Sequence, residues 1–120
     1  MVAMLGVTLV TKAQVLVSGK FVDDKAVCQI YEMQSDSSYC LLEATTKVKH
    51  KYLLKFEVNK IYLVKFTNKD NKSKTMRFIS YQSGNIDLDV DFKTSKNAYV
   101  TIKNNKTYLK RTNEPLLVIN

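Results

Sequence analysis

The sequence predicts an all-β fold, a single antiparallel β-sandwich of seven to nine strands. Apolar and polar residues alternate over long stretches, most clearly over residues 51–66, and a period of two is typical of half-buried strands. No window of about a dozen residues shows the apolar stripe of an amphipathic helix. The 120 residues suffice for one domain with its own core.

Turn-forming residues divide this alternation into nine candidate strands. Asp23-Asp24, Asn59-Lys60 and Ser83-Gly84-Asn85 are separators of this kind. Asn104-Asn105 predicts a tight two-residue hairpin, because Asn tolerates the positive φ that such a turn requires. Short strands about 8–12 residues apart favour a sandwich over βαβ units. The expected strands are 14–22, 25–33, 38–45, 51–58, 60–67, 74–81, 86–92, 98–103 and 107–111.

The apolar positions of these strands predict the core. Each expected core residue lies on the apolar parity of its strand, where the side chain points away from water. The expected buried set is Val17, Tyr52, Leu54, Phe56, Leu63, Phe78, Leu88 and Val90.

Residues 15 to about 80 resemble the carboxypeptidase-regulatory-like domains, a prealbumin-like group of β-sandwiches. Residues 17–31, VSGKFVDDKAVCQIY, are similar to the opening strands of that group, and the tyrosine-led repeats within residues 50–66 match two of its adjacent strands. The sequence departs from the pattern at His50, which usually is Gly, and at residues 68–71, which replace a glycine-bearing turn. The resemblance implies an immunoglobulin-like or prealbumin-like sandwich that serves as a binding or structural accessory module, with no catalytic residues.

The formal net charge of +8 comes almost wholly from lysine, since only two of the 19 basic residues are Arg. Specific recognition of nucleic acid favours the bidentate fork of Arg, so this ratio disfavours a nucleic-acid partner. Lysines on strands also keep sheet edges from pairing with other chains. We therefore expect a solvated, basic surface.

One set of lysines is nevertheless a candidate ligand-binding site, because its members are expected to share one strand face as a ladder of positive charge. A lysine ladder of this kind attracts phosphate, sulfated sugar or an acidic protein surface. The alternative interpretation is a solvated strand face. The candidate residues are Lys47, Lys49, Lys51 and Lys55.

Three carboxylates form a second charged ladder. Asp87, Asp89 and Asp91 alternate with apolar residues and are expected to share one exposed strand face. Calcium sites usually wrap the chain around the ion, which a straight strand does not do, so we expect no metal here. The carboxylates could instead pair with lysines on the next strand, or with the lysine ladder of a second subunit.

The sequence carries no sign of catalysis, and we expect neither an enzyme nor a cofactor. One histidine and two cysteines are too few for a tetrahedral zinc site. No G-x-S-x-G, H-E-x-x-H or phosphate-binding glycine loop occurs. We expect Cys28 and Cys40 to be free, buried thiols. With a turn near Asp36-Ser37, Cys40 would face Met33, so a disulfide requires a different register.

Both ends of the sequence are apolar. Residues 1–13 are either a signal-like segment cleaved after Ala13 or an uncleaved arm that packs on a sheet or a neighbouring subunit. Residues 14–112 form the expected sandwich, and residues 113–120 form an apolar tail. Membrane association is expected only through the first segment, which is too short to span a bilayer.

These features together predict a structural or adhesive subunit that decorates or bridges a larger assembly. That assembly would be a virus particle or a cell-envelope complex, so the expected location is extracytoplasmic or in a virion. The expected partners are other protein subunits, including copies of the same chain. The alternative is a binding module for an anionic ligand, such as polysaccharide or nucleic acid, that uses the lysine ladder.

Overall fold

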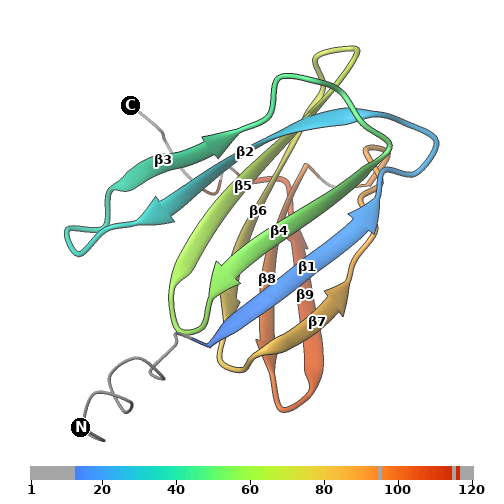
Figure 1. The fold of residues 1–120 in the computed structure, drawn as a ribbon. Helices are drawn as coiled ribbons and strands as arrows, with labels where there is room; N and C mark the ends of the chain where they lie inside the picture. Colours follow the sequence, from blue (N-terminus) through green and yellow to red (C-terminus); the bar gives the residue numbers. More distant parts are fainter. Residues whose placement is uncertain (1–12, 95, 115, 117–120) are drawn as a thin grey trace, which may run out of the picture.

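The computed structural model describes residues 13–94, 96–114 and 116, which form nine β-strands and no helix (Figure 1). The all-β prediction is confirmed. Within this part of the chain, no helix has the length and apolar character needed to cross a membrane. The strands are β1 (Gln14–Lys20), β2 (Ala26–Met33), β3 (Tyr39–Ala44), β4 (Lys51–Glu57), β5 (Ile61–Asn68), β6 (Ser73–Ser80), β7 (Gly84–Asp87), β8 (Asn97–Lys103) and β9 (Lys106–Thr112).

The strands form two packed sheets, which is a β-sandwich arrangement. The smaller sheet has three strands in the order β4-β1-β7, and the larger has six in the order β3-β2-β5-β6-β8-β9. The edge strands of the described residues are therefore β4 and β7 in one sheet and β3 and β9 in the other. Of the apolar ends expected from the sequence, residues 1–12 and 117–120 lie outside the described residues.

Two strand pairs are parallel, which differs from the wholly antiparallel arrangement that we expected. β1 runs parallel to β7, and β6 runs parallel to β8. Parallel neighbours require a long crossover connection. Here the chain leaves the larger sheet after β6, contributes β7 to the smaller sheet, and returns as β8 beside β6. The local alternation of residues predicts strands but carries no information on this exchange between sheets.

The core lies between the two sheets and is rich in aromatic rings. Phe56 of β4 stacks on Tyr62 of β5 with ring centroids 4.4 Å apart, and it also contacts Phe78 of β6 at 5.2 Å. Tyr52 of β4 contacts Phe66 of β5 at 5.1 Å. These contacts place β4 over β5 and β6. Strands β2 and β3, which lie beyond β5 in the larger sheet, therefore extend past β4.

The predicted core residues are buried, with one exception. Leu88 is only partly buried, and it packs against the margin of the core. Leu63 is buried on the other face of β5, outside the cluster between the sheets. On that outer face Arg77 lies over the ring of Tyr99 and donates a hydrogen bond to the carbonyl oxygen of Leu116, which is also buried.

Lys74 is buried near the start of β6, beneath the chain that connects β7 to β8. Its side chain is 1% exposed, and its Nζ donates to the carbonyl oxygen of Asp91 and to the hydroxyl of Thr94. Burial, with the nearby charge of Arg111, lowers the pKa of Lys74 to about 8. The side chain thus ties the β7–β8 connection to the larger sheet.

Asparagines in left-handed conformation close three of the turns. Asn59, between β4 and β5, has φ 67°, and Asn71, between β5 and β6, has φ 61°. Asn104 and Asn105 have φ 53° and 60°, and they connect β8 to β9 as a two-residue hairpin. The hairpin predicted from the Asn-Asn pair is confirmed.

The expected strand at 86–92 is shorter in the structure, where β7 ends at Asp87. The chain beyond it still follows β1, because the N–H of Val90 donates to the carbonyl of Lys20 at 2.9 Å. The ladder is broken at Asp89, whose carboxylate accepts the main-chain N–H of Lys20 at 3.0 Å. A side-chain acceptor has replaced a main-chain carbonyl there, which alternation alone does not reveal.

The two cysteines are free, and only one of them is buried. The β2–β3 turn pairs Met33 with Tyr39 and Glu32 with Cys40, so the expected pairing of Cys40 with Met33 is wrong by one residue. Cys40 is exposed and lies on the edge strand β3. The prediction that both thiols are buried is therefore wrong for Cys40 and confirmed for Cys28.

Candidate binding groove

A groove of about 550 Å³ lies between the edge strand β4 and the β2–β3 side of the larger sheet. This volume is in the range of small-ligand sites, about 300–1,000 Å³. Its floor is apolar and comes from Ala26, Cys28, Ile30, Tyr52 and Leu54, all of which are buried. Its rim is mostly polar and comes from Ser18, Glu43, Thr45, Lys47, Lys49, Lys51 and Leu53.

The groove exists because the smaller sheet is narrower than the larger one. Side chains of β4 stack on β5 and β6, and no further strand lies beside β4 among the described residues. The inner faces of β2 and β3 therefore extend past the sandwich, and five of the six residues of β3 are exposed. Figure 1 shows β3 lying to one side of the packed strands.

The connection from β3 to β4 is held against β2 by hydrogen bonds at two points, Thr45 and Lys49. Thr45 donates its N–H to the carbonyl of Cys28 at 2.9 Å and accepts the N–H of Cys28 on its hydroxyl at 2.8 Å. Lys49 exchanges two main-chain hydrogen bonds with Ala26, at 3.0 and 3.1 Å. The intervening residues pass along the rim and leave Val48 exposed.

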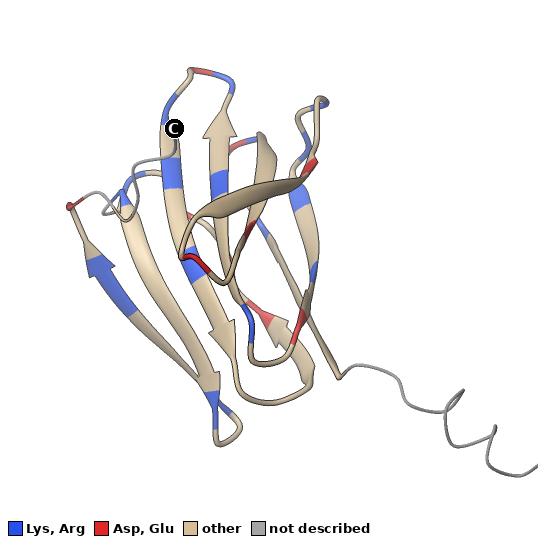
Figure 2. Ribbon diagram, turned by 90° about the vertical axis from the view of Figure 1, so that its left-hand side faces the viewer, with Lys and Arg blue, Asp and Glu red and all other residues tan. Residues whose placement is uncertain are grey.

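Three of the four candidate lysines meet at this groove. Lys47 and Lys49 come from the β3–β4 connection and Lys51 from the start of β4. Lys55 does not line the groove and lies exposed on the outward face of β4. Figure 2 shows Lys and Arg spread over both sheets, so the cluster at the groove is one local concentration on a broadly basic surface.

The thiol of Cys28, in the floor, is poorly suited to nucleophilic chemistry. Burial, together with the nearby charge of Glu43, raises the pKa of Cys28 to about 12. The thiolate is the reactive form, and at this pKa it is scarce at neutral pH. The groove thus offers apolar contact and positive charge, which are properties of a binding surface.

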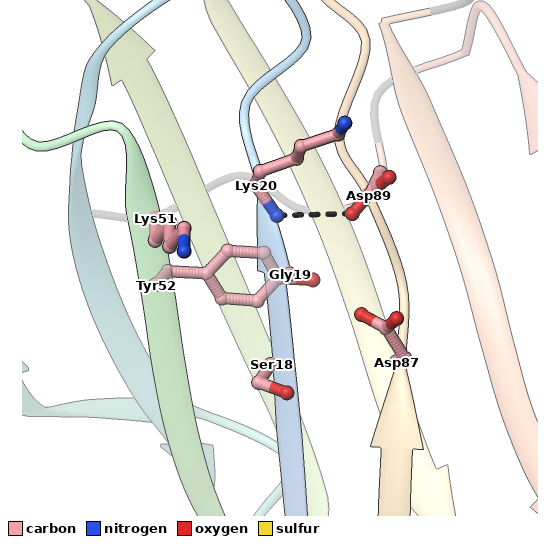
Figure 3. A pocket seen from close by; sticks show the side chains of 7 residues that line it. All are labelled: Ser18, Gly19, Lys20, Lys51, Tyr52, Asp87 and Asp89. Carbon is pink, nitrogen blue, oxygen red and sulfur yellow. Dashed lines mark hydrogen bonds between the residues drawn. The ribbon is translucent and has the colours of Figure 1, made fainter.

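A second depression of about 410 Å³ lies on the smaller sheet and shares Ser18, Lys51 and Tyr52 with the groove. Asp87, Asp89 and Lys20 also line it (Figure 3). The predicted acidic face therefore lies beside lysines of neighbouring strands in the same molecule. Opposite charges already meet here, which makes this depression a weaker candidate for an anionic ligand than the groove.

Tyr52 joins the two depressions and fixes the position of the chain after β7. Figure 3 shows its ring beside Gly19, and its hydroxyl donates to the carbonyl oxygen of Leu88. A Cβ at Gly19 would overlap that same oxygen, so this close approach of β1 and Leu88 requires glycine. Burial, followed by the nearby Cys28 and acidic groups, raises the pKa of Tyr52.

Asp91 does not belong to the acidic face. Its carboxylate accepts the N–H of Lys93 at 2.9 Å in a turn, and the residue is half-buried. The prediction of three carboxylates on one exposed face is correct for Asp87 and Asp89 and wrong for Asp91, because the chain turns at Asp91. Among the described residues, no three His, Cys, Asp or Glu side chains are grouped closely enough to hold a metal ion.

Sequence reasoning missed Leu53 and Glu43 as members of the groove. Leu53 is 67% exposed on the outward face of β4, between Lys51 and Lys55. The adjacent pair Leu53-Leu54 breaks the alternation of β4 by placing an apolar residue on the polar parity. The same signal is present at Leu41-Leu42 of β3, where both leucines are also exposed.

No protein-family model matches this chain, and no curated protein matches it. The all-β two-sheet architecture therefore rests on the structure itself, and no family match supports the resemblance to carboxypeptidase-regulatory-like domains.

Proposed function

We propose that this chain is a non-enzymatic structural or adhesive subunit that docks onto another protein through the β3–β4 groove. In this role it decorates or bridges a larger assembly, either a virus particle or a cell-envelope complex. The observation that carries the proposal is the groove itself, which combines an apolar floor with two strand edges that have no neighbour among the described residues.

Exposed apolar side chains support this choice of surface. Contiguous exposed apolar residues with a polar rim are typical of interaction sites. Of the seven large apolar residues that are exposed in the described chain, four lie on β3, on β4 or on the connection between them. These four are Leu41, Leu42, Val48 and Leu53.

We further propose that the sandwich is a prealbumin-like accessory domain. The two-sheet arrangement and the paired tyrosine-led strands β4 and β5 support this assignment. Such a domain would contribute a rigid surface and no catalytic group.

Binding of an anionic ligand is the second candidate, because Lys47, Lys49 and Lys51 line the same groove. Binding through these lysines should weaken steeply as the salt concentration rises, whereas a contact dominated by apolar burial should change little. Measuring the affinity at low and at high salt separates the two functions.

Lysine-specific cross-linking at native abundance tests the proposal. The expected result is a cross-link from Lys47, Lys49 or Lys51 to one recurring protein, which is lost when Leu53 is changed to Asp. Lys106 and Lys110 of β9, on the far edge of the larger sheet, are the internal control and should give no such link. A chain that is recovered alone, at the mass of a monomer, would contradict the proposal.

A further inference from the structure

We infer that the open edge of β4 receives an extended segment of the partner protein, in which acidic residues flank a short apolar run. This inference rests on the proposed function, and it adds the chemistry of the partner and the way it binds. The segment would pair with β4 as a fourth strand of the smaller sheet and cover the groove.

The main chain of β4 provides the first argument. The carbonyl of His50 accepts the N–H of Phe21 at 2.9 Å, and the N–H of Val58 donates to Ala13 at 3.0 Å. The even-numbered residues of β4 therefore bond to β1, because the main-chain groups of successive residues in an antiparallel pair point to opposite sides.

The odd-numbered residues consequently direct their main-chain groups to the open side. These are Lys51, Leu53 and Lys55, since the N–H of Glu57 already donates to the Tyr62 hydroxyl at 2.9 Å. Three residues whose outward N–H and C=O groups have no partner strand among the described residues form an edge of the kind that binds extended peptides by strand addition. The edge ends where Lys49 turns to pair with Ala26.

The side chains specify what such a strand carries. Lys51, Leu53 and Lys55 lie on the outward face of β4, so the residues opposite them should be acidic, apolar and acidic. The two residues between these point to the groove, whose floor includes Cys28 and Ile30, so they should be apolar. The complementary sequence is therefore acidic, three apolar residues, acidic.

A second copy of β4 fits this edge poorly. Antiparallel self-pairing centred on Leu53 places Lys51 opposite Lys55 of the other copy, and like charges directly opposite are destabilising. Pairing centred on Leu54 places Leu53 opposite a lysine and engages Glu57, which already pairs with Lys60 at 2.6 Å. The charges of this edge thus favour a different, acidic chain.

The lysines on the rim of the groove also favour an acidic partner segment. Lys47 and Lys49 continue the positive charge beyond the start of β4, and Glu43 is the one acidic residue among the described residues that line the groove. Residues that flank the acidic–apolar segment should therefore be acidic or neutral. A basic segment would meet four lysines along the same line.

The test is titration calorimetry of the full chain with a synthetic peptide that contains Glu-Val-Leu-Val-Glu between Gly-Ser flanks. We expect binding, and we expect the same peptide with Lys in place of both Glu residues to bind at least about tenfold more weakly. Methylation of the Leu and second Glu main-chain nitrogens should abolish binding, because these amides face β4. Methylation of the two Val nitrogens is the matched control and should have little effect.

Charge reversal in the protein completes the test. The double variant Lys51→Glu, Lys55→Glu should bind the lysine peptide better than the glutamate peptide, which inverts the wild-type preference. The control variant Lys106→Glu, Lys110→Glu on β9 should keep that preference. Circular dichroism confirms that both variants remain folded.

Several results would overturn the inference. These are no binding at millimolar peptide, equal binding of the glutamate peptide to wild type and to the Lys51/Lys55 variant, equal effects of the two methylation patterns, or dimerisation of the chain through β4. If the cross-linked partner of the proposed function is still recovered with the charge-reversed variant, this mode of binding is wrong while the proposed function stands. If no partner is recovered with wild type, the proposed function itself fails.

Discussion

Strands β3 and β5 have similar apolar content and opposite surroundings. β5, IYLVKFTN, lies between β2 and β6 and is buried along most of its length. β3, YCLLEA, is an edge strand of the same sheet and is exposed at five of its six positions. The comparison shows that position within the sheet, rather than composition, decides whether an apolar side chain stabilises the fold or remains available to a partner.

The largest expected difference between the two regions is in the cost of truncation. Phe56→Ala, opposite β5, should lower the free energy of unfolding by about 3–5 kcal/mol, because it removes a ring that stacks on Tyr62 and contacts Phe78. Leu42→Ala on β3 should change it by less than about 0.5 kcal/mol. Denaturant unfolding measures both, and similar costs for the two variants would break the comparison.

Gly19→Ala tests the close packing of β1 against the chain that follows β7. The added methyl group would overlap the carbonyl oxygen of Leu88 and displace the chain after β7, so we expect a loss of roughly 1–3 kcal/mol. Ser18→Ala, one residue earlier on β1, is the matched control and should be nearly neutral. Unaltered thermal stability of the Gly19 variant would mean that β1 and Leu88 do not approach each other closely.

The pH dependence of the free energy of unfolding tests the burial of Lys74 in the larger sheet. Its pKa is lowered from 10.5 to about 8 in the fold, so the folded state releases this proton at lower pH than the unfolded state does. The stability of wild type relative to Lys74→Met should therefore be constant below about pH 8 and rise between about pH 8 and 10.5, by roughly 3 kcal/mol. A relative stability that is flat across this window would show that Lys74 titrates normally.

The smallest expected effect on stability is at Leu53, which is exposed on the edge strand β4. Leu53→Ser removes an exposed side chain and should change the free energy of unfolding by less than about 0.5 kcal/mol. The same variant should weaken binding of the acidic–apolar peptide at least about tenfold. A large loss of stability would show that Leu53 packs within the domain instead.

The sequence predicts the strands well and their arrangement only in part. Alternation and turn residues locate eight of the nine strands to within two residues at each end, because both are local properties of the chain. The parallel pairs β1–β7 and β6–β8 depend on which sheet β7 joins, which is a long-range property. The early end of β7 arises from the hydrogen bond between Asp89 and Lys20, residues far apart in the sequence.

The groove could be predicted only in fragments. The lysine spacing identifies Lys47, Lys49 and Lys51, and the paired leucines mark β3 and β4 as strands with an apolar residue on the polar side. The groove itself depends on β4 packing over β5 and β6 rather than over β2, which follows from ring contacts that no local pattern contains.

Residue-resolved amide hydrogen exchange of β4 tests the central claim, that its outer edge is open and receives an acidic–apolar strand. In the free chain, the amides of Tyr52, Leu54 and Phe56 should exchange slowly, and those of Lys51, Leu53 and Lys55 should exchange fast. Saturation with the Glu-Val-Leu-Val-Glu peptide should slow the second group at least about tenfold. Odd-numbered amides that remain fast under saturation, or that are already slow in the free monomer, would contradict the account.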